Sequence, residues 1–120
     1  MDIIVSVAAV NNNGDLGTFS NWGPKTVDLG APGVNIFSTM VGNEYNNVIV
    51  DMLGKKITWD GTSMATPHVA GAAALYWSEH PENSWRDVKD AVLSSVRKTS
   101  NLSNKIRTGG RLDAAALMNQ

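Results

Sequence analysis

Cysteine is absent from this 120-residue chain, and charge imbalance and long apolar runs are absent too. Without cysteine there is no disulfide, no thiolate nucleophile and no cysteine-ligated zinc, although this absence does not fix a cellular compartment. The formal net charge is only −1, so no basic field attracts nucleic acid. No apolar run is long enough to span a bilayer. We therefore expect neither nucleic acid nor a membrane as a partner.

The remaining composition is that of an ordinary folded protein. Hydrophobic residues make up 42% of the chain and charged residues 18%. A chain of this length can form one small core, and its sequence contains no internal repeat. We expect residues 1–120 to belong to a single domain.

The most informative segment, DGTSMATPHVAG, runs from Asp60 to Gly71. Its glycine allows a close backbone approach, and Thr62 and Ser63 are expected to cap a helix. Pro67 fits such a helix only in the first turn. Backbone N–H groups and the positive end of the helix dipole would then surround Ser63, which suits a site where an oxyanion develops during acyl transfer.

This segment resembles the active-site serine segment of the subtilisin-like serine proteases, the subtilase family. Two upstream segments, TFSNWGP at 18–24 and VDLGAPGV at 27–34, follow the order found in that family. A lone Gly-x-Ser would be weak evidence, but three ordered segments are specific. The resemblance extends from about Ile3 to the C-terminus and implies the C-terminal part of a subtilase catalytic domain.

The resemblance implies an α/β fold, the C-terminal portion of a three-layer structure in which helices flank a mainly parallel sheet. It also implies a serine endopeptidase that forms an acyl-enzyme on Ser63, with Thr62 and the N–H of Ser63 supporting the oxyanion hole. Proteins or peptides would be the substrates. An extracellular or secreted location follows from the family alone.

The catalytic constellation is expected to be incomplete in this chain. The subtilisin triad has the chain order Asp, His, Ser, which places the acid and the base upstream of the matched region. The family's oxyanion asparagine also lies upstream, so residues 11–13, three asparagines, are interpreted as a turn. We expect the missing N-terminal half to be a partner and the isolated chain to be inactive.

Neither histidine is expected to replace the missing base. On a helix that begins near Ser63, His68 is rotated roughly 140° away and raised about 7.5 Å. We interpret it as a structural histidine that points away from Ser63 and hydrogen-bonds under the helix. His80 lies about 25 Å along the same helix by rise alone, and it is typical of a C-terminal residue that complements the dipole.

No metal or cofactor is expected. Some family members bind calcium near the segment that contains Asp28. Here Thr26 stands at a neighbouring position where the family has a carboxylate, which argues against a calcium site.

The segments before the serine motif are predicted as strands and turns. Residues 3–10 predict a strand buried on both faces of a parallel sheet. Short extended pieces at 18–20 and 26–28 precede a turn at 31–33 and a further strand of the sheet at 34–40.

Residues 42–47 are interpreted as a polar loop, and residues 48–52 and 56–59 as a β-hairpin. This hairpin either shapes the edge of a substrate cleft or is a surface elaboration, and the sequence leaves both open. Trp59, just before the serine motif, is a candidate substrate contact, whereas Trp77 and Trp85 are expected to pack.

Helices are predicted after the serine motif. The alanine-rich helix from Thr62 is expected to be central. A second helix has Ser84 as N-cap and Asp87 three residues later, and its apolar side is expected to extend to Val96. Glycines 109 and 110 break the chain, and residues 111–117 after them resemble the family's closing short strand and terminal helix.

A different class of function stays open. A non-catalytic subtilase fragment could act as an interaction module, pairing its exposed strand at 3–10 with an upstream fragment or with another copy of itself. An unrelated binding module with a coincidental motif does not account for three ordered matches.

Overall fold

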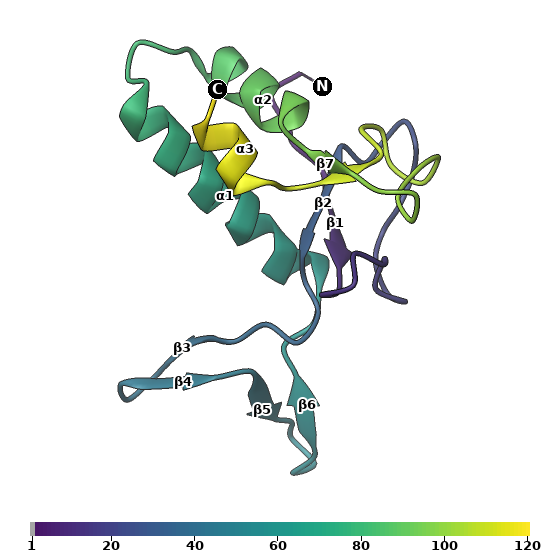
Figure 1. The fold of residues 1–120 in the computed structure, drawn as a ribbon. Coiled ribbons are helices and arrows are strands. Elements are labelled where there is room, and N and C mark those ends of the chain that lie inside the picture. Colours follow the sequence, from purple (N-terminus) through teal and green to yellow (C-terminus); the bar gives the residue numbers. More distant parts are fainter. Residues whose placement is uncertain (1) are drawn as a thin grey trace.

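The structure is a computed structural model that describes residues 2–120. It consists of a body built around a four-stranded sheet and of an arm formed by residues 34–60 (Figure 1). The strands before the serine motif are β1 (Val7–Val10), β2 (Leu29–Pro32), β3 (Ser38–Met40), β4 (Glu44–Asn46), β5 (Val48–Val50) and β6 (Lys56–Thr58). After them come α1 (Thr62–Glu79), α2 (Trp85–Ser94), β7 (Arg97–Lys98), β8 (Gly110–Arg111) and α3 (Ala114–Met118). None of the helices within residues 2–120 has the length and apolar composition needed to cross a membrane.

The body sheet has the strand order β1-β2-β8-β7. β1 is parallel to β2, β2 is parallel to β8, and β8 is antiparallel to β7. This confirms the α/β class with a mainly parallel sheet. The turn predicted at 31–33 was wrong in part, because Ala31 and Pro32 belong to β2. Pairing with β1 outweighs the local turn preference, and Pro32 is tolerated as the last residue of its strand.

The side chains of β1 alternate between the two faces of the sheet, and each face is covered by a hydrophobic core. Val7 and Ala9 face the three helices, whereas Ala8 and Val10 face the turns between residues 99 and 109. The helix-side core consists of Val7, Ala9, Leu29, Ala31, Ala65, Val69, Ala72, Tyr76, Val88, Ala91, Val92 and Leu117. The opposite core consists of Ala8, Val10, Val27, Leu102 and Ile106.

The strand predicted over residues 3–10 is confirmed at Val7–Val10, which is buried on both faces, and is too long at its start. Ile3 and Ile4 precede the sheet and are 69% and 50% exposed. An apolar run alone does not reveal where the partner strand begins, and β2 pairs only from Leu29 onward.

The outer edge of β1 is partly covered by the segment that contains the TFSNWGP motif. The buried Ser20 hydroxyl accepts a hydrogen bond from the Ala9 N–H at 2.9 Å, and the Gly17 N–H donates to the Ala9 carbonyl at 2.9 Å. Residues 18–20 and 26–28, predicted as short extended pieces, lie partly in turns and form no strand. The predicted turn at 11–13 is confirmed, with the Asn11 side-chain oxygen accepting from the Asn13 and Asp15 N–H groups.

The arm contains two small antiparallel sheets, β3–β4 and β5–β6. The predicted hairpin is confirmed as β5–β6. The strand predicted over 34–40 does not continue the body sheet, and the loop predicted over 42–47 contains β4, which pairs with β3. Phe37 and Tyr45 stack across this pair with ring centroids 6.0 Å apart, a contact that polar neighbours obscure in the sequence.

The second predicted helix is confirmed, including its capping box. The Ser84 hydroxyl accepts from the Asp87 N–H at 3.3 Å, and the Asp87 carboxylate accepts from the Ser84 N–H at 2.8 Å. The helix ends at Ser94, so Val96 lies beyond it. The next two residues form β7 against β8, where Gly110 approaches so closely that a Cβ would lie 2.7 Å from Val96 Cγ2. The predicted short strand and terminal helix are confirmed as β8 and α3.

Candidate active site

Ser63 is the second residue of α1, with Gly61 as the N-cap. The predicted capping by Thr62 or Ser63 was wrong, since no side chain caps this helix end. Instead, the Gly61 carbonyl accepts from the N–H groups of Met64 and Ala65 at 3.0 and 3.2 Å. Within residues 2–120 the N–H groups of Thr62 and Ser63 have no hydrogen-bond acceptor. The first turn of α1 thus presents two free donors beside the Ser63 side chain.

Pro67 is the sixth residue of α1, beyond the first turn in which it was expected. Because proline has no N–H, it cannot donate to the carbonyl of Ser63, four residues earlier. Burial of Ala65, Val69 and Ala72 in the core offsets this loss and keeps the helix continuous.

A short chain of backbone contacts fixes Ser63 to the sheet. The Gly33 N–H donates to the Val10 carbonyl at 3.0 Å, and the Gly61 N–H donates to the Gly33 carbonyl at 2.7 Å. β1 and β2 end at Val10 and Pro32, so the start of α1 lies at the carboxyl ends of two parallel strands. Functional groups in parallel α/β sheets gather at this edge.

Ser63 borders a cavity of about 420 Å³ between α1 and the arm. Trp59 and Met64 line it next to the serine, and Phe37 and Met40 line it from the arm. Its mainly apolar wall is suited to an apolar side chain. The main chain of Trp59 is held at both groups, with its N–H donating to the Asn47 carbonyl and its carbonyl accepting from the Ile36 N–H, each at 3.0 Å.

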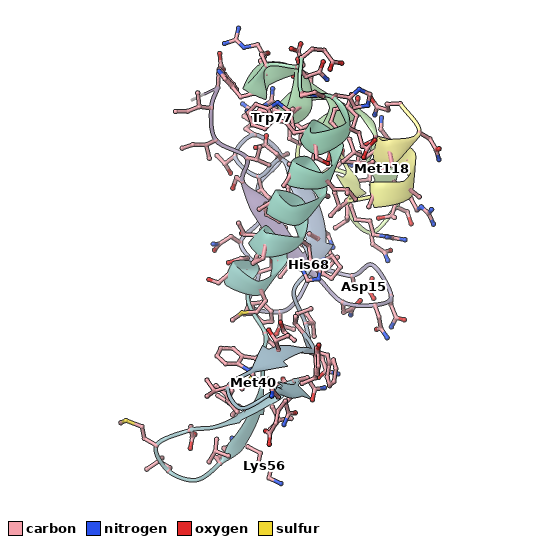
Figure 2. All side chains as sticks on the ribbon, turned by 90° about the vertical axis from the view of Figure 1, so that its left-hand side faces the viewer. Asp15, Met40, Lys56, His68, Trp77 and Met118 are labelled. Atoms are coloured by element: carbon pink, nitrogen blue, oxygen red, sulfur yellow. The ribbon has the colours of Figure 1, made fainter. Side chains whose placement is uncertain are left out.

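His68 borders the same cavity as Ser63, and its pointing away from Ser63 stays a prediction. Figure 2 shows His68 toward the end of α1 that adjoins the arm. Helical rotation separates the two Cα positions, but long side chains from adjacent turns still reach one cavity. The predicted structural hydrogen bond is present, with His68 Nδ1 2.9 Å from the Met64 carbonyl oxygen. No hydrogen bond joins His68 to Ser63 within the described part of the chain.

His80 is at the opposite end of α1, where it forms the C-cap as predicted. Its ring centroid lies 4.4 Å from that of Tyr76, and its Nδ1 lies 3.6 Å from the Glu82 carboxylate. The structure therefore does not bring His80 and Ser63 together.

Asp60, whose role the sequence left open, holds the base of the arm. Its carboxylate accepts from the Asn35 N–H at 2.5 Å and from the Thr58 hydroxyl at 2.9 Å. Asn35 adopts a φ of 56°, and its side-chain oxygen accepts from the Asn47 side-chain amide at 2.6 Å. The sequence contained one signal of this arrangement, because asparagine is among the residues that tolerate a positive φ.

The carboxylate of Asp28 is buried and bound within the body. It accepts from the Ser6 N–H at 2.9 Å and pairs with Arg107 at 3.3 Å. Across residues 2–120 no group of three or more His, Cys, Asp or Glu side chains is arranged to hold a metal ion. The absence of calcium stays a prediction.

Comparison with known proteins agrees with the motif. The profile of the subtilase family matches residues 2–109. The chain is 40% identical over 89 residues to a thermostable alkaline protease of Halalkalibacterium halodurans, covering 74% of this chain and 21% of that protein. It is also 40% identical over 97 residues to subtilisin E of Bacillus subtilis, covering 81% of this chain and 22% of that protein.

A solved structure of the serine protease MycP1, described as an essential component of the type VII (ESX-1) secretion system, superposes with a TM-score of 0.86 at 26% identity. The match covers 98% of this chain and 31% of MycP1. This chain therefore spans about a fifth to a third of the proteins it matches. From the profile, the relatives and the shared fold, we conclude that the chain belongs to the subtilase family.

Proposed function

We propose that Ser63 is the nucleophile of a serine endopeptidase. The observation that carries the proposal is the position of Ser63, exposed at the start of α1 beside two free N–H groups and a largely apolar cavity. An exposed serine at a helix N-terminus can attack a carbonyl whose developing oxyanion meets those donors. The relatives named above are proteases, which supports the same chemistry.

In this mechanism Ser63 Oγ attacks the scissile carbonyl carbon and transfers its proton to a histidine base. That base then gives the proton to the leaving amine as the peptide bond breaks, and water hydrolyses the acyl-enzyme on Ser63. The N–H groups of Ser63 and Thr62 stabilise the oxyanion. In the intact enzyme an aspartate orients the histidine.

The base and the aspartate come from outside this chain in our proposal. The His68 ring is bound to the Met64 carbonyl and makes no hydrogen bond to Ser63 within residues 2–120, and His80 lies at the far end of α1. The isolated chain is therefore inactive and needs the rest of a catalytic domain as its partner. Loss of subtilisin triad residues lowers turnover by a factor on the order of a million.

Trp59 and the cavity it lines are proposed to contact protein or peptide substrates. Apolar side chains from both α1 and the arm surround the site, so an apolar substrate residue fits it best. Action outside the producing cell, on extracellular protein, is proposed from the family. The arm thereby shapes the edge of the substrate cleft through residues 36–40 and Trp59, whereas β5 and β6 of the hairpin do not line the cavity.

Fluorophosphonate labelling followed by intact mass measurement tests the nucleophile. We expect Ser63 to be labelled when a polypeptide carrying the catalytic Asp and His is supplied, and not in the chain alone. Ser63→Ala should abolish labelling. Ser78→Ala is the matched control on the same helix, because its hydroxyl donates only to the Leu75 carbonyl. Labelling that persists in Ser63→Ala would overturn the assignment.

The alternative is a non-catalytic interaction module, favoured by the open part of the β1 edge. Val7 has the same orientation as Ala9, but the segment at 17–20 covers only the Ala9 position. An uncovered strand edge can pair with another chain. Analytical ultracentrifugation of the chain alone measures self-association. Self-association, together with absence of labelling under every condition of the first experiment, would favour this module over the enzyme.

A further inference from the structure

The segment from residue 97 to residue 112 concentrates positive charge. The segment contains no Asp or Glu. Five of the chain's ten Lys and Arg residues lie in it: Arg97, Lys98, Lys105, Arg107 and Arg111. Since the whole chain has a formal net charge of −1, the remaining residues carry a net −6 (−1 minus +5). The segment also contains five Ser, Thr and Asn residues before Arg107, which supply hydrogen-bonding groups.

This segment and Pro24 line a second cavity, open to solvent and of about 530 Å³, whose wall does not include Ser63. Lys98, Arg107, Ser100 and Ser103 are among the residues that line it, and no carboxylate does. The cavity is formed by the turns that cover the sheet face opposite the helices. Its position is therefore fixed by the core that contains Leu102 and Ile106.

Two cationic side chains meet at this cavity. Within the described residues Lys98 makes no ion pair. Arg107 pairs with Asp28 through Nη1 at 3.3 Å, but its side chain is still 62% exposed. Asp28 does not line the cavity, and its other carboxylate oxygen accepts from the Ser6 N–H. The cavity wall thus has an excess of positive charge.

Free hydrogen-bond donors lie in the same wall. The N–H groups of Ser100 and Asn104 have no acceptor in residues 2–120, and both residues are exposed and line the cavity. Ser100 also contributes its hydroxyl to the wall. Successive N–H groups in turns are available to a bound anion.

We propose that this cavity binds a tetrahedral oxyanion, phosphate or sulfate. Lys98 and Arg107 would neutralise its charge, and the free N–H groups with the Ser100 hydroxyl would donate to its oxygens. Charge-assisted hydrogen bonds of this kind are stronger than neutral ones, and Arg and Lys are the usual phosphate ligands. Anion binding would stabilise the folded chain, because the unfolded chain lacks the cavity.

Calorimetric titration of the chain with sodium sulfate and with inorganic phosphate, at an ionic strength held constant with sodium chloride, tests the proposal. We expect saturable one-to-one binding. Lys98→Met should weaken it at least about tenfold through loss of a charge-assisted contact. Lys56→Met removes the same charge from the arm, which Figure 2 shows far from the body, and should leave affinity unchanged.

Ser100→Ala separates binding from folding. It removes an exposed hydroxyl from the cavity wall, so the thermal midpoint without anion should be unchanged while affinity for sulfate falls. Far-ultraviolet circular dichroism confirms that each variant is folded. If Lys98→Met does not fold, Ser100→Ala still tests the cavity wall.

Three results would overturn the site. They are the absence of saturable binding, equal weakening by Lys98→Met and Lys56→Met, and an affinity for sulfate that Ser100→Ala leaves unchanged. Acetate that binds as tightly as sulfate would refute the preference for a tetrahedral anion. Ser63 labelling does not depend on this cavity, so failure here is distinguishable from failure of the proposed enzyme.

Discussion

At Gly33 the absence of a side chain lets the sheet and α1 meet. A Cβ at this position would lie 2.6 Å from the Ala9 Cβ, 2.7 Å from the Gly61 carbonyl oxygen and 3.1 Å from the Ala65 Cβ. Two of these neighbours are Cβ atoms and one is backbone, so none can rotate away. Gly33 thus sets the distance between β1 and the segment that holds Ser63.

We predict that Gly33→Ala destabilises the chain by about 1–3 kcal/mol, because the added methyl overpacks this junction. Chemical denaturation monitored by circular dichroism measures the change. Gly71→Ala is the control, since a methyl group at this position of α1 would meet no atom within 4 Å. That substitution should stabilise the helix by about 0.5–1 kcal/mol. Equal effects at the two positions would contradict the role given to Gly33.

The sequence predicted the serine at a helix start because glycine, hydroxyl residues and an alanine-rich run form a local pattern. It did not predict which groups form the hydrogen bonds at the start of that helix. Gly61 supplies its carbonyl, and its own N–H is held by Gly33, which lies 28 residues earlier in the chain. The role of Asp60 was missed for the same reason, as its partner Asn35 is distant in sequence.

Among the elements, α2 has the most completely satisfied N-terminus. Hydrogen bonds from the Ser84 hydroxyl and then from the Ser84 backbone N–H lower the pKa of Asp87. At α3 the Ala116 N–H, followed by Arg97, lowers the pKa of Asp113 in the same way. A carboxylate with a lowered folded-state pKa stabilises the fold above its unfolded pKa, and the stability is lost as the pH falls through the folded pKa.

We predict that Asp87→Asn lowers the thermal midpoint by a few degrees at pH 7, where the carboxylate is charged. The difference from the native chain should shrink as the pH falls below the usual aspartate range, because native Asp87 then becomes neutral as well. Thermal melts at a series of pH values measure this. Asp90→Asn, which removes the same charge from the same helix, should change little, and a pH-independent difference for Asp87→Asn would refute the prediction.

Helices and strands were predicted correctly from the sequence where the pattern is local, and they were missed where a strand pairs with a segment distant in sequence. Ser84 with Asp87, and the hairpin at 48–59, were identified because each pattern lies within a dozen residues. β4 and β7 were missed, since their partners decide that they are strands. Arg97 and Lys98 are extended only because β8 approaches them closely at Gly110.

Across the whole molecule, the body and the arm differ in burial. β1 lies between two cores, whereas β4 and β6 are exposed along their length. Val41, Met52 and Leu53 in the arm are each more than 90% exposed. Isolated two-stranded sheets with little burial are marginally stable, so the arm depends on its attachment to the body.

We predict that amides of β5 and β6 exchange with solvent orders of magnitude faster than those of Ala8 and Val10. Opening the arm exposes little apolar surface, whereas exposing β1 requires the body to unfold. Hydrogen exchange measured by mass spectrometry or NMR tests the difference. Comparable protection in the two regions would mean that another chain or a longer part of this protein covers the arm.

The hydrogen bonds at the base of the arm have a consequence for protein engineering. The Asn35 N–H donates to Asp60, the Ile36 N–H donates to the Trp59 carbonyl, and the Gly61 N–H donates to the Gly33 carbonyl. The chain therefore leaves the body and returns to it at one clamped position. Residues 37–58 can be exchanged as a cassette, for grafted loops of other lengths, while the clamp keeps the Ser63 backbone in register. Selectivity could then be varied in libraries without rebuilding the nucleophile.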